Sequence, residues 1–188
     1  MCISLMTDRL ILRPWKDSDL DQFALMSQNN EVMRYFPELL SRTKSDDLAN
    51  LIQSFIEKQG WGFWALELKE TTEFIGFTGL HHQPEQFDFS PCTEIGWRLK
   101  RSAWGQGLAF EAASACLGFG FHQLKLNEIV AFTATQNLPS QKLMLRLGMS
   151  KKCDFDHPQI DDHHHLKKHV LYGMTATQFE ENIEKNST

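Results

Sequence analysis

The stretch of sequence that decides the fold lies near the middle of the chain. It reads Arg98-Leu99-Lys100-Arg101-Ser102-Ala103-Trp104-Gly105-Gln106-Gly107-Leu108-Ala109. A predicted strand ends at Leu99, a tight glycine turn follows, and a helix rich in small residues begins. Glycine lets the backbone approach a ligand closely and adopt positive φ. The first N–H groups of a helix are free, and its dipole places about half a positive charge beside them. The pattern therefore predicts a site for an anion such as a diphosphate.

The residues after the second glycine argue against two common phosphate-binding motifs. A P-loop requires Lys and then Ser or Thr after its last glycine, whereas this chain has Leu108 and Ala109. A dinucleotide fingerprint requires a glycine three residues after Gly107, and that position is Phe110. A nucleotide-binding protein is therefore disfavoured. Taken alone, the stretch is also compatible with a plain strand-to-helix turn with packing glycines.

Hydrophobic periodicity predicts the elements around this turn. Strands are expected at residues 7–14, 61–68, 74–81, 93–99, 128–135 and 169–174. Helices are expected after an N-cap at Asp17, between Ser45 and Gly60, from about residues 105–107, at 139–147 and at 175–185. The second helix should bury Leu48, Leu51, Ile52, Phe55 and Ile56. The order β-α-α-β-β-β-α-β-α-β indicates one mixed α/β or α+β domain.

Composition limits the classes of protein that the chain can represent. With 188 residues, of which 41% are hydrophobic, it suits a single globular domain. The net charge of −5 argues against a nucleic-acid surface. No apolar run approaches the roughly 20 residues that a membrane span needs, and the start lacks the features of a signal peptide. We therefore expect a cytoplasmic protein whose four cysteines, which form no CxxC pair, are free thiols.

A second motif follows the predicted strand at 128–135. It reads Asn137-Leu138-Pro139-Ser140-Gln141-Lys142-Leu143-Met144-Leu145-Arg146-Leu147-Gly148-Met149. Together with residues 104–112, it resembles the GNAT superfamily of N-acetyltransferases, and most closely the branch that includes the ribosomal-protein N-terminal acetyltransferases. In that superfamily the pyrophosphate loop has Gln or Arg, two residues, Gly, one residue, and Gly or Ala. Gly107 and Ala109 match its last positions, whereas Trp104 occupies the Gln/Arg position. The resemblance extends over nearly the whole chain.

The resemblance implies a fold and a cosubstrate. The fold would be one GNAT domain over residues 1–188, with a core at about 7–175 and a central mixed sheet whose fourth and fifth strands splay apart, flanked by helices. Acetyl-CoA would bind through its diphosphate to Trp104, Gly105, Gln106, Gly107, Leu108 and Ala109. Its pantetheine arm would pair with the edge formed by Trp97 and Leu99 and contact Asn137 and Ser140. Alternatively, Asn137 and Ser140 only cap a helix, which both residue types favour.

Acetyl transfer to an amine needs a base and a proton donor for the thiolate. Glu94 is the first candidate for the base, because the family often has a carboxylate on this strand; its alternative role is an ion pair with Arg98. His81 and His82 are weaker candidates, since histidine has a suitable pKa. The tyrosine that many members place seven residues after the Asn is replaced by Met144. Ser140 is therefore the candidate proton donor, with water as the alternative.

These residues predict an acetyl-CoA-dependent N-acetyltransferase in which a primary amine attacks the thioester directly. The acceptor would be a small molecule or a protein N-terminus, and the protein a monomer or homodimer. The alternative is a non-catalytic acyl-CoA sensor. The cluster Asp161-Asp162-His163-His164-His165 has a metal-site composition, but adjacent histidines rarely converge on one ion, so we expect a solvated loop and no metal. Residues 33–37 border the acceptor pocket in the family; their aromatic side chains either shape specificity or pack in the core.

Overall fold

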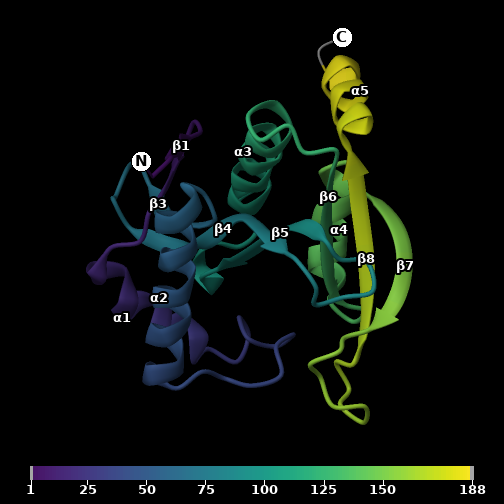
Figure 1. Cartoon of the computed structure of the whole chain (residues 1–188). Coiled ribbons are helices and arrows are strands. Elements are labelled where there is room, and N and C mark those ends of the chain that lie inside the picture. Colours follow the sequence, from purple (N-terminus) through teal and green to yellow (C-terminus); the bar gives the residue numbers. More distant parts are fainter. Residues whose placement is uncertain (1, 187–188) are drawn as a thin grey trace. The chain divides into compact units, whose positions relative to one another are not determined.

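The structure, a computed structural model, describes residues 2–186 and consists of two compact units (Figure 1). One unit comprises the described residues up to Leu80 together with Gly96–Cys116, and the other comprises His81–Ile95 and the described residues from Leu117 onward. The strands are β1 (Leu5–Met6), β2 (Leu10–Arg13), β3 (Phe63–Leu68), β4 (Phe74–Gln83), β5 (Cys92–Leu99), β6 (Glu128–Ala134), β7 (Ser150–Asp156) and β8 (Lys168–Thr175). The helices are α1 (Asp17–Ser27), α2 (Arg42–Gln59), the 3₁₀ helix η1 (Arg101–Ala103), α3 (Leu108–His122), α4 (Leu138–Arg146) and α5 (Ala176–Asn186).

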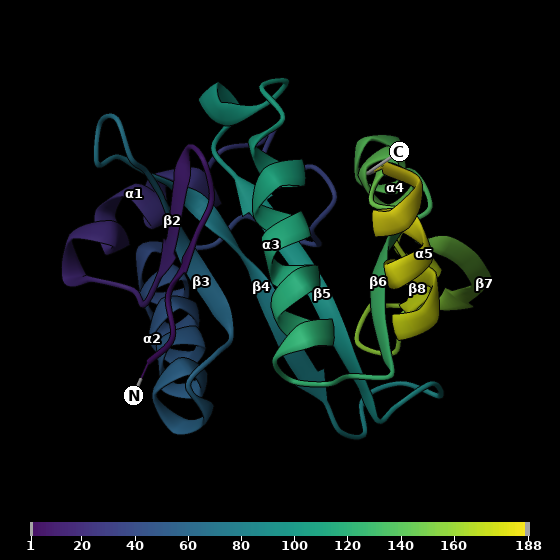
Figure 2. The same cartoon turned by 90° about the horizontal axis from the view of Figure 1, so that it is seen from above.

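The first unit is an antiparallel arrangement of strands with two helices packed against it. β2 pairs with β1 and β3, and β3 pairs with β4 as the predicted hairpin. Figure 2 shows α2 lying along β3, with α1 beside it. The hydrophobic core of this unit buries Leu10, Leu12, Phe23, Ile52, Ile56, Trp64 and Leu66, all at most 5% exposed. Burial of these side chains supplies most of the driving force for folding this unit.

A buried ion network fixes the start of α1 to the sheet. The guanidinium of Arg13 donates to both carboxylate oxygens of Asp19, at 2.7 and 2.9 Å, and to Glu67 Oε2 at 2.6 Å. Asp19 also accepts from the backbone N–H of Lys16 at 2.8 Å, which completes the N-terminal cap of α1. Because each charge in this network has a partner of opposite sign, the network joins β2, β3 and α1 without leaving a buried charge unpaired.

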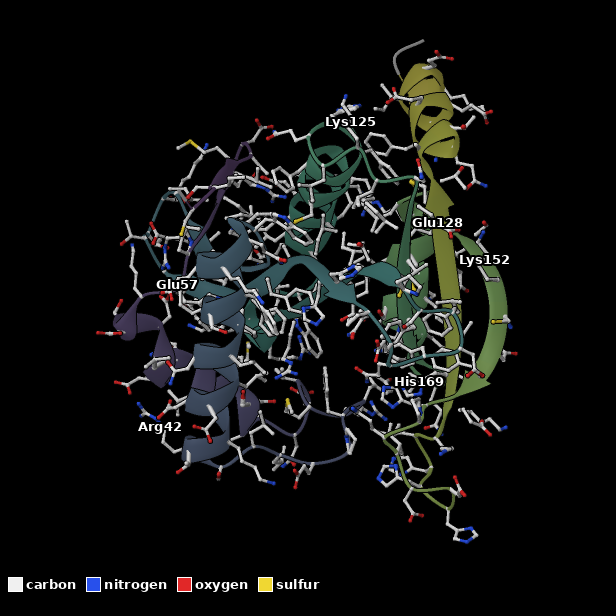
Figure 3. All side chains as sticks on the ribbon, in the orientation of Figure 1. Arg42, Glu57, Lys125, Glu128, Lys152 and His169 are labelled. Carbon is white, nitrogen blue, oxygen red and sulfur yellow. The ribbon has the colours of Figure 1, made fainter. Side chains whose placement is uncertain are left out.

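The second unit is built around β8. β8 lies between β6 and β7 and is antiparallel to both, and Figure 1 shows α5 continuing from its end. α4 covers one face, where the Tyr172 hydroxyl donates to Gln141 at 3.3 Å. At the start of β6, Glu128 pairs with Lys152 of β7 at 2.8 Å (Figure 3). Residue 94 of β5 pairs with Val130 of β6 in parallel, and this is the sole Cα pair between those strands among the described residues.

The hydrogen-bonded strand order is β1-β2-β3-β4-β5-β6-β8-β7, in which β4 and β5 contribute residues to both units. One parallel pair among antiparallel ones makes the sheet mixed, and the helices that flank it confirm the predicted mixed α/β fold class.

Several predicted boundaries are wrong. The sequence prediction has no strand at β1 or β7; the side chains of β7 are polar and mostly exposed, so its sequence shows no hydrophobic alternation. α2 begins at Arg42 with Ser41 as its N-cap, and Ser45 lies inside the helix, fully buried. The prediction placed this start too late because the first turn of α2 is polar. Leu51, predicted to be buried, is 52% exposed.

Candidate functional site

The glycine turn of the first unit forms an open cradle of backbone amides. Gly105 and Gly107 have φ values of 73° and 77°, in the left-handed region that favours glycine. Added Cβ atoms would meet nothing within 4 Å at Gly105 and only Arg9 Nη2, at 3.6 Å, at Gly107. Among the described residues, the backbone N–H groups of 105–109 donate no hydrogen bond. These amides precede or begin the 15-residue helix α3, so the turn has the geometry and the partial charge of an anion site.

An ion pair between Arg9 and Glu111 holds this turn in place. Arg9 Nε and Nη2 donate to Glu111 Oε2 at 2.7 and 2.6 Å, and Thr7 Oγ1 donates to Glu111 Oε1 at 2.6 Å. Arg9 Nη1 also donates to the carbonyl oxygen of Gln106 at 3.0 Å. Sequence reasoning missed this clamp, although Arg9 and Glu111 both lie in stretches that resemble the family. The Arg9–Glu111 pair therefore holds the Gln106 carbonyl in place and positions the Arg9 guanidinium beside Gly107.

The side chains of the turn bind its own backbone. Trp104 Nε1 donates to the carbonyl of Leu99 at 2.9 Å, and Gln106 Nε2 donates to the carbonyl of Ser102 at 2.8 Å. The Trp104 ring is 42% exposed and lies under the guanidinium of Arg101, 5.0 Å from its ring centroid. Leu108, the first residue of α3, is buried, and Ala109 after it is half-buried. The turn is therefore held in shape before any ligand binds.

The end of β5 that leads into the turn presents backbone groups at one edge. Lys100 N–H donates to Ile75 of β4 at 2.8 Å, and Gly96 O accepts from Thr78 Oγ1 at 2.8 Å. Hydrogen-bonding groups alternate along a strand, so residues 96, 98 and 100 direct theirs toward β4. The backbone groups of Trp97 and Leu99 therefore point to the opposite edge. An extended ligand with amide groups can pair with such an edge.

In the second unit, Asn137 and Ser140 occupy the start of α4. Asn137 is the N-cap: its Oδ1 accepts from the Ser140 N–H at 3.3 Å, and its Nδ2 donates to Thr133 Oγ1 at 2.9 Å. The capping role that sequence analysis left open is therefore present. An amide side chain has a further N–H and a further lone pair, so Asn137 can cap the helix and still hydrogen-bond a ligand. The Ser140 hydroxyl is half-buried and has no hydrogen-bond partner among the residues described.

Met144 lies where many family members carry a tyrosine, and it is buried, at 1% exposure. The hydroxyl of Tyr172, in the same unit, donates to Gln141 at 3.3 Å. Tyr35 lies in the loop between α1 and α2. Neither tyrosine occupies the position of Met144, so α4 has no tyrosine that could protonate the thiolate.

Glu94 is a carboxylic acid with a strongly perturbed acidity. Burial raises the pKa of Glu94 to about 7, although the hydrogen bond that its Oε1 accepts from Gln83 Nε2, at 3.2 Å, opposes the rise. A carboxyl group with this pKa exchanges protons readily near neutral pH.

The two candidate histidines differ in position on β4. His81 lies two residues before Gln83, so both side chains are on one face of the strand. Burial, and to a lesser degree the neighbouring His82, lowers the pKa of His81. His82 is exposed and points to the other face. The structure therefore brings His81, but not His82, to the face from which Gln83 reaches Glu94.

The histidine-rich segment at 161–165 is a turn with mostly exposed side chains, in which His164 and His165 stack at 4.5 Å. Within residues 2–186 there is no group of three or more His, Cys, Asp or Glu side chains that could hold a metal ion. The four cysteines are free thiols. None of the helices in the described part of the chain combines the length and the apolar composition that crossing a bilayer requires.

Comparison with known proteins decides the family. An acetyltransferase (GNAT) domain matches residues 9–150, which include strands β2 to β6, the glycine turn and the Asn137 motif. The chain belongs to the GNAT acetyltransferases. It is 34% identical to the N-acetyltransferase YoaA of Bacillus subtilis over 152 residues, which cover 79% of this chain and 83% of YoaA. The predicted recognition of this family is thereby confirmed, and the chain is assigned to the transferases.

Solved GNAT structures share the fold. A GNAT-family acetyltransferase from Bacillus anthracis superposes with a TM-score of 0.78 at 21% identity and covers 93% of this chain and 99% of its own. The ribosomal-protein-S5-alanine acetyltransferase from Vibrio fischeri superposes with a TM-score of 0.73 at 17% identity, covering 93% and 97% of the two chains. At these identities the likeness establishes the fold alone. Acetyl-CoA is the cosubstrate that membership of the GNAT family implies.

Proposed function

We propose that this GNAT protein transfers the acetyl group of acetyl-CoA to the primary amine of a small molecule or a protein N-terminus, by direct attack of the amine on the thioester. The observation that carries the proposal is the cradle at Gly105 and Gly107. Its backbone N–H groups lack acceptors, and no side chain fills the space at Gly105. A diphosphate supplies oxygen acceptors for several such amides at once, so these residues fit the diphosphate of acetyl-CoA.

Further residues of the chain fit the rest of the cosubstrate. The backbone groups of Trp97 and Leu99 would hold the pantetheine amides in the manner of an added strand. The unused amide hydrogen of Asn137 would donate to the same arm. Bound acetyl-CoA supplies an activated acyl group, and backbone N–H groups at the edge of β5 would stabilise the negative charge that develops on the thioester oxygen.

Glu94 would act as the general base. An amine enters as an ammonium ion and must lose a proton before it attacks the thioester carbon. A carboxylate with a pKa of about 7 can accept that proton near neutral pH, directly or through water. The new C–N bond forms as the C–S bond breaks, and the leaving thiolate takes up a proton. The Ser140 hydroxyl is the proposed donor of that proton, and water would serve in its absence.

Release of the CoA thiol tests this function. Purified protein is incubated with acetyl-CoA and a panel of primary amines, and free thiol is measured against a control without amine. We expect thiol release that depends on one class of amine, together with an N-acetylated product by mass spectrometry. If acetyl-CoA binds but no amine in a broad panel of amino acids, polyamines, aminoglycosides and peptides accelerates thiol release, the protein is a binding module and the proposal fails.

A further inference from the structure

Arg98 of β5 is a half-buried residue whose guanidinium lies among aromatic rings. The central carbon of its guanidinium lies 4.0 Å from the ring centroid of Phe36, 5.3 Å from that of Phe77 and 5.9 Å from that of Phe23. All of these residues belong to the first unit. Arg98 Nε and Nη1 are buried and have no hydrogen-bond partner among the described residues. These two nitrogens carry most of the N–H donors of a guanidinium.

This arrangement is energetically incomplete. A buried charge without hydrogen-bond partners is costly, and contacts with aromatic faces offset only part of that cost. Arg13, in the same unit, has its guanidinium occupied by Asp19 and Glu67. Burial lowers the pKa of Arg98 to about 10, so the side chain is still a cation at neutral pH. An anion beside Nε or Nη1 would supply the missing acceptors.

The position of Arg98 separates it from the diphosphate cradle. Its side chain lies against Phe77 of β4. The next residue of β4, Thr78, faces the other side of the sheet, toward Cys116 of α3. α3 therefore covers the face opposite Arg98, and its first turn forms the cradle. With the cradle on the α3 face, the amine that attacks the thioester would approach from the other face of the sheet. Arg98 lies on that other face, and it belongs to β5, the strand that supplies the proposed pantetheine edge.

We propose that Arg98 binds a carboxylate of the acceptor, so that the substrate is an amine bearing a carboxylate, such as an amino acid. The inference rests on the proposed function and narrows its acceptor class. A planar carboxylate can take two parallel hydrogen bonds from one edge of a guanidinium, and both edges of Arg98 include an unpartnered nitrogen. Phe36, which is 37% exposed, forms the wall of this site nearest to solvent.

Nuclear magnetic resonance of the arginine Nε–H groups detects this binding without turnover. The Arg98 signal is assigned by its loss in Arg98→Lys, and the protein is titrated with acetate, phosphate and chloride at constant ionic strength. We expect a saturable shift of the Arg98 signal with acetate and no change at Arg13, whose Nε already donates to Glu67. No saturable shift with acetate, or saturation by phosphate alone, overturns the carboxylate assignment.

Acceptor preference provides the second test. Wild type, Arg98→Met and Arg42→Met are assayed with a pool of α-amino acids and the matched pool of their α-carboxamides. Arg42 is an exposed residue at the start of α2, paired with Asp21 and Asp46, and serves as the matched control (Figure 3). We expect kcat/KM for the carboxylates to fall by about 30-fold or more in Arg98→Met, as when one partner of a buried charge pair is removed, and to be unchanged in Arg42→Met.

The two pools also separate this inference from the proposed function. Amidation lowers the pKa of the amine and by itself favours the carboxamides, so a wild-type preference for carboxylates requires recognition of the charge. If wild type acetylates both pools equally, or Arg98→Met slows both equally, the acetyltransferase function is supported and the proposed role of Arg98 is refuted. If no acetyl-CoA is bound, the proposed function fails instead, whatever the titration with acetate shows.

Discussion

Glu94 is the side chain whose chemistry can be tested most sharply. If it is the base, kcat/KM must rise with pH as its carboxyl group ionises, with an apparent pKa of about 7. Glu94→Gln should remove this limb of the profile and reduce kcat by about 10²–10⁴-fold, while leaving the affinity for acetyl-CoA within a few-fold. The measurement is the pH dependence of thiol release. An equal loss in turnover and in acetyl-CoA affinity would contradict the assignment and indicate a structural role.

The same residue makes stability depend on pH. Because the pKa of Glu94 is raised in the folded state, the fold binds a proton that the unfolded chain has lost between about pH 4.5 and 7. The stability contributed by that proton is complete below pH 4.5 and is lost as pH rises through 7. In denaturant unfolding, the free energy of unfolding of Glu94→Gln should increase relative to that of wild type by up to about 3 kcal/mol as pH rises across this interval. Parallel profiles for the two proteins would contradict the raised pKa.

Single residues also show where sequence reasoning stops. Gly105, Gly107 and Asn137 were predictable because local patterns specify turns and caps. The pairing of Arg9 with Glu111 and the placement of Arg98 among Phe23, Phe36 and Phe77 join residues distant in sequence, and only the folded chain brings them together. The assignment of Glu94 as base remains a prediction, although its environment is that of a group with altered acidity.

At the scale of elements, a substitution in the turn that begins α3 can block acetyl-CoA binding. Gly107→Glu should abolish measurable acetyl-CoA binding, because the new carboxylate would enter the phosphate cradle and compete for Arg9, 3.6 Å from the added Cβ. The positive φ adds a cost of about 1–2 kcal/mol to folding. Gly118→Glu is the matched control: it places the same charge within α3, the helix that begins directly after Gly107, at a position with nothing within 4 Å of an added Cβ. Calorimetry of both variants is the measurement, and unchanged binding by Gly107→Glu would refute the placement of the site.

The attachment of α1 to β2 and β3 depends on one buried carboxylate. Asp19→Ala should lower the free energy of unfolding by about 3–5 kcal/mol, because it leaves part of the Arg13 charge buried and uncompensated. Asp17→Ala, at an exposed position on the same helix, should change it by at most about 0.5 kcal/mol. Urea unfolding measures both. A loss below about 1 kcal/mol in Asp19→Ala would show that the network contributes little.

Elements with a strong pattern were predicted well, and those without one were not. The hairpin of β3 and β4, the glycine end of α2 and the start of α4 follow from alternation, a left-handed Gly60 and an Asn–Pro cap. β7 could not be found, since a polar edge strand is defined by its partner β8 rather than by its own sequence. Ser41 and Ser45 are equally good caps in sequence, and only the folded loop selects Ser41.

For the whole molecule, family and fold were predictable because two motifs in the correct order constrain every element around them. The family match over residues 9–150 confirms that prediction. The acceptor was not predictable, because neither of the two motifs specifies the side chains that would bind it. In our proposal, Arg98 and its aromatic neighbours narrow the acceptor class.

Calorimetric titration of the intact protein with acetyl-CoA, with ATP and NAD as controls, tests the central claim most directly. The open amides of residues 105–109 predict binding of acetyl-CoA at micromolar or tighter affinity, about −8 kcal/mol. ATP and NAD should give no comparable binding, because the chain lacks the P-loop lysine and the third glycine of the dinucleotide fingerprint. Absence of acetyl-CoA binding, or tighter binding of either nucleotide, would contradict an acetyl-CoA-dependent transferase.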